Sequence, residues 1–172
     1  MPDTGGINGV QDALVIRPAA PADVPLMLSL VRELAEFERE PNAVKATEED
    51  FMRDAFGPQP RFHCVIAEWW GEPAGFALYF YNYSTWVGKA GIYLEDLFVR
   101  SAYREKGIGK HLFRHMARLA VEQNLGRLVW NVLKWNETAI RFYESLGAVD
   151  LCEWTTMRLN RKDLERLAAE FA

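Results

Sequence analysis

A stretch in the second half of the chain, DLFVRSAYREKGIGKHLF at residues 96–113, joins an apolar run to a helix-like run through a short basic turn. The turn contains Gly107 and Gly109, which are separated by one residue. Three cations lie beside them: Arg104, Lys106 and Lys110. This pattern predicts a strand, a glycine turn and a helix, in that order. The first turn of such a helix presents free backbone N–H groups and the positive end of the helix dipole.

A turn of this kind suits a diphosphate, because glycines let a ligand approach the backbone N–H groups. The alternative is a plain strand-to-helix turn in which the glycines allow close packing. The chain lacks the G-x-x-x-x-G-K-[ST] pattern of a P-loop. It also lacks the G-x-G-x-x-G pattern that follows an early βαβ unit in dinucleotide-binding domains. The agreement of strand, helix and local cations favours a phosphate-bearing ligand.

The rest of the chain predicts strands before α/β crossovers. Strands are expected at residues 13–19, 61–70, 74–84, 91–99, 127–133 and 153–159, and helices at 20–40, 47–57, 107–123, 136–147 and 161–171. Asp23 and Thr47 are the expected N-caps of the first two helices, and Gly57 is the expected end of the second. Residues 71–73 join two strands in a hairpin, though not of the tight two-residue kind. This order predicts an α/β (α+β) fold, a mixed sheet with helices on both faces.

Length and charge limit the classes of function. A chain of 172 residues suits one domain, here residues 13–172 after a flexible leader, residues 1–12. The formal net charge of −4 argues against general affinity for nucleic acid or anionic membrane. No run reaches about 18 apolar residues, and the N-terminus lacks the pattern of a signal peptide, so a cytoplasmic protein is expected. Cys64 and Cys152 indicate no disulfide framework. A Cys64–His63 nucleophilic pair is disfavoured because adjacent strand residues point to opposite faces.

Three acids interrupt apolar patterns. Glu38 falls where the apolar stripe of the first helix ends, so it is either solvated or lines a pocket. Glu95 and Asp96 stand side by side inside the apolar run 91–99. One of them must face a polar pocket or the other side of the sheet, unless the strand ends or bulges there. A bulge would leave backbone amides available to a ligand.

The sequence motifs resemble those of the GNAT acetyl-CoA-dependent N-acetyltransferases. The resemblance is carried by RxxGxG at residues 104–109, which follows LEDLFV, and by WNETAIRFYESLGA further along. The ordered set VIRPA, RELAEFE, FGPQPRFHCVIAE, YSTWVGK, YLEDLFV and YREKGIG resembles the diamine (spermidine/spermine) acetyltransferase group. The segments EFE and YSTW are more similar to the thialysine acetyltransferase branch of this group than to its polyamine branch. The resemblance covers roughly residues 13–160.

This resemblance implies a GNAT-like fold with a mostly antiparallel central sheet, acetyl-CoA as cosubstrate, no metal, and a homodimer. The implied donor-binding residues are Leu97, Phe98, Val99, Arg104, Glu105, Lys106, Gly107, Ile108, Gly109, Lys110 and Asn136. Tyr143 matches the tyrosine taken as general acid, and Glu95 the carboxylate that binds the amine or relays its proton. Phe37, Glu38 and Trp86 match positions around the amine. Without the family pattern, Tyr143 reads as a core aromatic.

The chemistry agrees with these roles. A primary amine has a pKa near 10.4 and must lose a proton before it attacks a thioester, and a carboxylate can take that proton. The segment NYSTW places no acid beside Trp86, and Phe37 has no hydroxyl, which weakens a spermine-like substrate. A lysine or thialysine side chain or a short diamine fits better. A protein or peptide acceptor, and a non-catalytic acyl-CoA-binding sensor, stay open as alternatives.

Overall fold

A computed structural model of the chain describes residues 13–170. The leader expected at residues 1–12 lies outside the described part. The chain divides into two compact units, residues 1–131 and residues 132–172. The first unit contains the sheet and the helices that cover it, and the second contains the last two helices.

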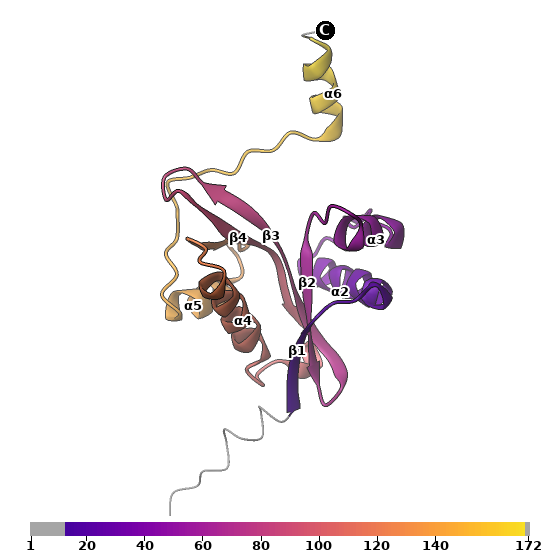
Figure 1. Cartoon of the computed structure of the whole chain (residues 1–172), viewed down its shortest axis with the longest axis vertical. Helices are drawn as coiled ribbons and strands as arrows, with labels where there is room; N and C mark the ends of the chain where they lie inside the picture. The colour runs from indigo at the N-terminus through magenta and orange to yellow at the C-terminus, as the bar shows by residue number, and fades with distance from the viewer. Residues whose placement is uncertain (1–12, 171–172) are drawn as a thin grey trace, which may run out of the picture. The chain divides into compact units, whose positions relative to one another are not determined.

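The first unit is built on one mixed sheet (Figure 1). Within residues 13–131 its strands follow the order β1 (Leu14–Pro18), β2 (His63–Trp69), β3 (Glu72–Ser84), β4 (Lys89–Val99) and β5 (Leu128–Trp130). The first four strands pair in antiparallel fashion, and β5 runs parallel to β4. The predicted mixed, mostly antiparallel sheet is therefore confirmed.

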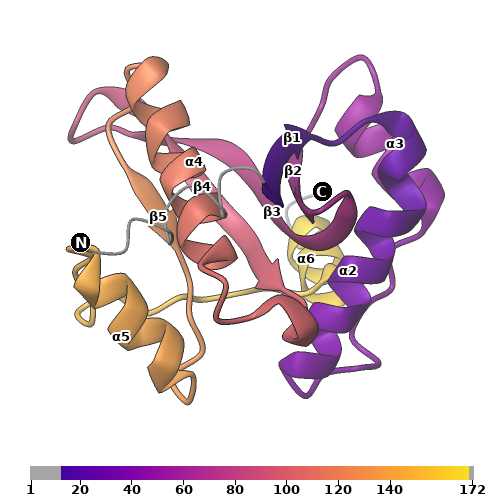
Figure 2. The same cartoon turned by 90° about the horizontal axis from the view of Figure 1, so that it is seen from below.

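Helices cover both faces of this sheet, as predicted (Figure 2). Helices α2 (Val24–Phe37) and α3 (Glu48–Phe56) lie on one face, and α4 (Ile108–Glu122) lies on the other. The core under α2 includes Met27 and Leu30, which are fully buried together with Phe76 of β3. Two short 3-10 turns, η1 (Pro21–Asp23) and η2 (Ser101–Tyr103), precede α2 and α4.

Both residues that were expected as N-caps lie at the N-cap positions of their helices. The Thr47 hydroxyl accepts the Asp50 N–H at 3.2 Å, and the Asp50 carboxylate accepts the Thr47 N–H at 3.0 Å. This reciprocal pair begins α3, which ends at Gly57 as predicted. Asp23 also lies at the N-cap position of α2. Its carboxylate accepts hydrogen bonds from the Ala20 N–H and from Arg17 instead of capping the helix.

The hairpin between β2 and β3 corrects the sequence prediction. Trp69 pairs with Glu72, so only Trp70 and Gly71 form the turn. Their φ angles of 52° and 82° are both positive, as a two-residue type I′ turn requires. The expectation of a looser turn was wrong because tryptophan holds a position where asparagine or aspartate is the usual signal.

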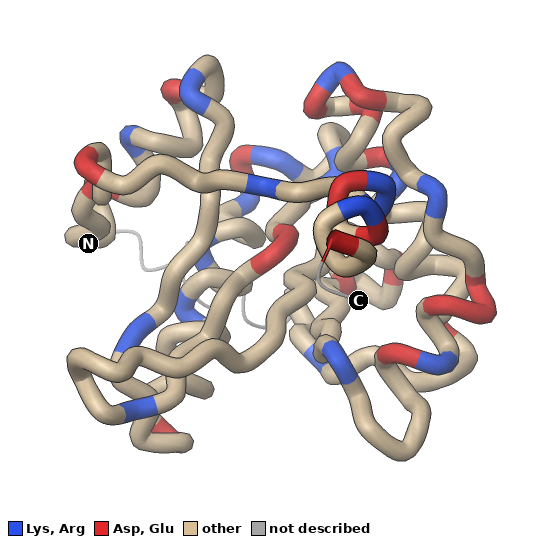
Figure 3. Tube along the Cα trace, turned by 90° about the horizontal axis from the view of Figure 1, so that it is seen from above, with Lys and Arg blue, Asp and Glu red and all other residues tan. Residues whose placement is uncertain are grey.

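The second unit contains α5 (Glu137–Ser145) and α6 (Arg161–Ala169), as predicted. Charged residues of both signs lie along α6 (Figure 3), and ion pairs join Arg161 to Glu165 and Arg166 to Glu170. The strand expected at residues 153–159 is not formed. The pattern there favours a strand, but no other strand occurs among residues 132–170 to pair with it. The strand expected at 127–133 shortens to β5.

Candidate functional site

The glycine turn connects the end of β4 to α4 as the sequence predicts. Gly107 has a φ of 77° and is the N-cap of α4. A residue with a side chain would be strained there. Glu105 also adopts a positive φ, of 64°, so two residues of the turn have the left-handed backbone conformation. The N–H groups of the first helical turn follow directly after it.

The packing alternative for the two glycines finds no support in their surroundings. A Cβ atom on Gly109 would lie 3.8 Å from Cγ2 of Val99, and one on Gly107 would lie 3.9 Å from Cδ2 of His111. Both distances are ordinary van der Waals contacts. Close packing within the described chain therefore requires neither glycine. Their small size keeps the helix N-terminus open to a ligand.

Two of the three nearby cations contact aromatic rings. The guanidinium of Arg104 lies 4.5 Å from the centre of the Phe37 ring and 5.8 Å from that of Phe98. Its Nε donates a hydrogen bond to the Val99 carbonyl at 3.1 Å. The ammonium of Lys106 lies 5.5 Å from the Trp69 ring. These contacts hold the turn against the ends of α2, β4 and β2.

Strand β4 contains a bulge at Glu95. Asp96 pairs with Leu78 and Leu94 pairs with Tyr79, so Glu95 is the extra residue. The bulge leaves backbone groups outside the ladder. It also separates the two adjacent acids, because Glu95 is exposed while Asp96 lies on the face covered by α2.

The last residues of β4 have one unpaired edge within the first unit. Leu97, Phe98 and Val99 pair with β3 on one side. On the other side, β5 pairs only with Ile92, Tyr93 and Leu94. Between residues 13 and 131 no strand continues this pairing past Leu94. The backbone groups on this edge can therefore bind an extended ligand, as a neighbouring strand would.

A cavity of about 320 Å³ opens between the end of α2 and the bulge. Its lining residues are Val31, Leu34, Ala35, Glu38, Glu40, Ala43, Val44, Lys45, Ala46 and Asp96. Burial raises the pKa of Asp96 to about 7, and the charges of Glu95 and Glu38 add to this rise. Partial burial also raises the pKa of Glu38. Three carboxyl groups and one ammonium thus line a mostly apolar cavity, which suits a small cation with a carbon chain.

The structure separates the residues predicted around an amine. Glu38 lines the cavity, whereas Phe37 does not and contacts the Arg104 side chain instead. Asp96 lines the cavity, whereas Glu95, which the resemblance selected from this pair of adjacent acids, does not. The sequence signal for Asp96 was its two-residue spacing from Phe98, which packs in the core under α2.

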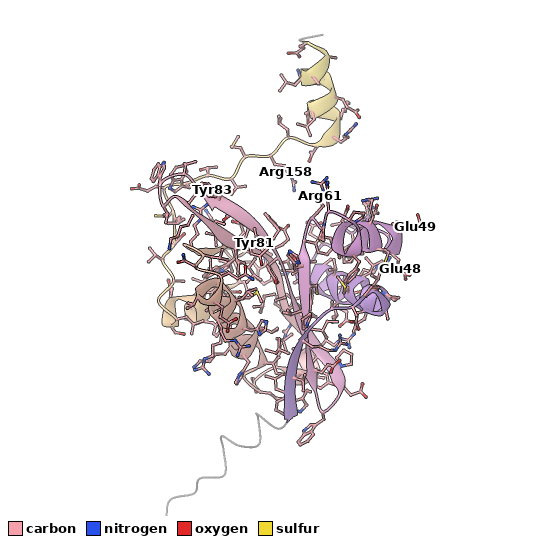
Figure 4. The ribbon with its side chains drawn as sticks, viewed as in Figure 1. Glu48, Glu49, Arg61, Tyr81, Tyr83 and Arg158 are labelled. Carbon is pink, nitrogen blue, oxygen red and sulfur yellow. The ribbon has the colours of Figure 1, made fainter. Side chains whose placement is uncertain are left out.

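Trp86 lies far from this cavity. It sits in the turn between β3 and β4 and is 87% exposed. The hairpin extends beyond the start of β2, and Tyr81 and Tyr83 lie along the extension (Figure 4). From Lys89 to Asp96, β4 advances about 23 Å at roughly 3.3 Å per residue. The structure therefore does not bring Trp86 to the cavity.

In the second unit, Asn136 and Tyr143 both lie on α5. Asn136 is the N-cap, and its side-chain oxygen accepts the Ala139 N–H at 3.2 Å. This bond leaves the amide NH₂ group to donate elsewhere. The Tyr143 ring packs at 5.3 Å from Phe142. Burial raises the pKa of Tyr143 above its usual value, so the phenol stays protonated at neutral pH.

Residues 13–170 contain neither a membrane-spanning helix nor a metal-binding cluster. No helix in this part of the chain has the length and apolar character needed to cross a bilayer. No group of three or more His, Cys, Asp and Glu side chains within the same residues is arranged to hold a metal ion.

Comparison with known proteins connects this geometry to one family. The model of the acetyltransferase (GNAT) family matches residues 27–148. Thialysine N-epsilon-acetyltransferase of Bos taurus is 39% identical over 91% of this chain and 98% of that protein. L-ornithine N5-acetyltransferase of Arabidopsis thaliana is 32% identical over 88% of this chain and 86% of its own length. An integron cassette protein of V. cholerae superposes with a TM-score of 0.76 at 28% identity, covering 91% and 98% of the two chains. The chain belongs to the GNAT family of acetyltransferases, which use an acyl-CoA donor.

Proposed function

We propose that the protein transfers the acetyl group of acetyl-CoA to a primary amine on a small molecule, such as a lysine-like or thialysine-like side chain or a short diamine. The observation that carries this proposal is the cavity lined by Glu38, Glu40 and Asp96 beside the β4 bulge. An acidic cavity next to a strand edge with unpaired backbone groups can hold an amine and a thioester side by side.

The donor is assigned to the residues after the bulge. The free edge of Leu97, Phe98 and Val99 would bind the pantetheine arm through backbone hydrogen bonds. The diphosphate would bind at residues 104–110, where Gly107 and Gly109 leave the N-terminus of α4 open. The amide NH₂ of Asn136 would donate to the cofactor arm.

The acceptor would enter as an ammonium and leave its proton on a carboxyl group. Asp96, with a pKa of about 7, is matched to this task, because a general base works best near the operating pH. Glu95, exposed at the bulge, is the second candidate, acting directly or through water. The amine nitrogen then bonds to the thioester carbon while the carbon–sulfur bond breaks. A backbone N–H at the bulge would stabilise the oxyanion, and Tyr143 would protonate the leaving thiolate.

Two comparisons support a basic amino acid side chain as acceptor. The bovine and Arabidopsis relatives are both named for the amine of an amino acid, thialysine in one and ornithine in the other. The cavity of about 320 Å³ with three carboxyl groups suits one aliphatic chain with one ammonium end. A long polyamine carries several charges and would need acids spaced along a longer channel.

We also propose that residues 13–172 work as one cytoplasmic N-acetyltransferase domain in a homodimer. The match of the family model runs from residue 27 to 148 and so includes parts of both compact units. The length of β4 between the turn that holds Trp86 and Asp96 supports a dimer in which Trp86 reaches the cavity of the partner. The segment after α5 adds exposed apolar side chains, among them Val149 and Met157.

A panel of acceptors tests the proposed function. Purified protein is incubated with acetyl-CoA and thialysine, lysine, ornithine, putrescine, spermidine or a lysine-containing peptide, and free thiol is measured. We expect the highest kcat/KM with thialysine, lysine or ornithine. A preference for the peptide would assign the protein to peptide acetylation. Tight binding of acetyl-CoA without thiol release on any amine would assign it to the sensor class.

A further inference from the structure

The tight turn between β2 and β3 presents two adjacent indoles that the proposed acetyl transfer does not use. We propose that Trp70 forms a stacking surface for the purine base of the donor, near the glycine turn to which the diphosphate is assigned. This inference rests on the proposed function, because it requires a nucleotide-bearing donor at that turn.

The backbone of Trp70 is held in an unfavourable conformation. Its φ of 52° is rare for any residue with a large side chain. The Trp70 N–H donates to the Ala13 carbonyl at 2.7 Å, which fixes the turn to the start of β1. The indole is 69% exposed, so burial of its ring does not repay the strain. Strained residues that packing does not explain are often found at ligand sites.

The two turns lie at the same end of the sheet. Gly75 of β3 pairs with Val99, and the Arg100 N–H donates to the Ala74 carbonyl at 2.9 Å. The β2–β3 turn and the segment that leads into α4 therefore lie close together (Figure 1). Lys106 makes the direct link, since its ammonium lies 5.5 Å from the centre of the Trp69 ring.

The chemistry of the donor matches this arrangement. The adenine of coenzyme A is joined to the diphosphate through a ribose that carries a further phosphate. An exposed indole offers a flat surface on which a base can stack in water. Lys106, in the glycine turn and 5.5 Å from the Trp69 ring, would place a positive charge near the ribose phosphate. Trp69 fixes that ammonium, and Trp70 remains exposed for the base.

Calorimetric titration with two ligands tests the inference. Coenzyme A carries the base, whereas 4′-phosphopantetheine carries the arm without it. We expect Trp70→Ala to raise the Kd for coenzyme A by about 5- to 100-fold, the range expected for one stacked base. The Kd for 4′-phosphopantetheine should not change. Trp70→Phe keeps an aromatic ring and should retain most of the affinity.

Two more variants separate stacking from folding. Trp70→Gly suits the positive φ and should unfold at a higher temperature than the wild type while losing affinity for coenzyme A. Trp154→Ala removes an indole of similar exposure, 71%, and should leave both Kd values unchanged. Unchanged affinity of Trp70→Ala for coenzyme A, or equal loss for both ligands, would overturn the inference alone. Failure of the wild type to bind coenzyme A would overturn the proposed function and the inference together.

Discussion

At the scale of single residues, two adjacent acids at the β4 bulge have different environments. The sequence predicted that either Glu95 or Asp96 must leave the apolar pattern, and the family resemblance selected Glu95. The structure places Asp96 in the cavity and leaves Glu95 exposed. Alternation counted back from Phe98 indicates Asp96, but alternation counted along the whole strand does not, because a bulge shifts it by one residue and the position of the bulge depends on the neighbouring strand.

The raised pKa of Asp96 makes folding stability depend on pH. Its pKa is 3.8 in the unfolded chain and about 7 in the fold. The folded state therefore binds more protons between these values, and stability falls as the pH rises from about 4 to about 7. The loss of folding stability above pH 7 is at most about 4 kcal/mol, from roughly 1.4 kcal/mol per pKa unit.

We expect Asp96→Asn to be more stable than the wild type at pH 8 and close to it at pH 4, because the amide carries no charge to desolvate. Chemical unfolding of both proteins at the two pH values measures this. An equal difference at both would show that Asp96 does not titrate in this range.

Glu38 gives a second test at this scale. Glu38→Gln removes one of the charges that line the cavity, so we expect the KM for the amine to rise several-fold or more. The Kd for acetyl-CoA should stay the same. Glu36→Gln, an exposed acid of α2 that does not line the cavity, is the matched control. Amine kinetics that are identical in the two variants would remove Glu38 from the amine site.

Tyr143 is tested by removing only its hydroxyl. Tyr143→Phe keeps the ring beside Phe142 and removes the proton donor. We expect kcat to fall by about 10²- to 10⁴-fold, the usual contribution of a general acid. The Kd for acetyl-CoA should be retained. Stopped-flow or steady-state thiol release measures the rate, and full turnover by the variant would exclude the role.

At the scale of elements, periodicity predicted most of the helices and strands. The apolar stripes of α2 and α4 and the capping pair of α3 were readable because their interactions are local. The tight β2–β3 turn and the absence of a strand at residues 153–159 could not be read from the sequence pattern. A turn with an unusual residue, and a strand that needs a partner, both depend on contacts that are distant in sequence.

Gly109 allows stability and donor binding to be separated. Gly109→Ala places a methyl group at an ordinary contact distance from Val99, in a helix where alanine is preferred by about 1 kcal/mol. We therefore expect Gly109→Ala to be as stable as the wild type or more so. The methyl group would obstruct the amides of α4, so the Kd for acetyl-CoA should rise at least tenfold. Thermal unfolding and calorimetry test the two effects, and unchanged affinity would place the diphosphate elsewhere.

At the scale of the whole molecule, the position of Trp86 bears on the proposed dimer. The sequence resemblance assigned Trp86 to the amine site. Trp86 precedes β4, and the seven residue steps of that strand from Lys89 to Asp96 separate it from the cavity. Sequence alone could not show this separation, because it follows from how far the β3–β4 hairpin extends.

Mixing two inactive variants tests whether Trp86 acts across a dimer. Trp86→Ala and Tyr143→Phe should each reduce turnover. When the two variants are co-refolded, a mixed dimer would contain one site with the native Tyr143 and the partner's native Trp86. We expect activity to recover toward a fraction of the wild-type value. No recovery, with a dimer confirmed by sedimentation, would show that Trp86 acts in its own protomer or not at all.

Most of the residues that line the cavity belong to one connecting segment. Six of its ten lining residues lie in the loop between α2 and α3, and only Asp96 comes from the sheet. The residues assigned to the pantetheine arm and the diphosphate all lie elsewhere, from Leu97 onward. Under the proposed function, substitutions in this loop would change the preferred amine without altering strand register or the glycine turn. Acceptor choice would then be the property of this protein that can diverge while the donor-binding residues stay unchanged.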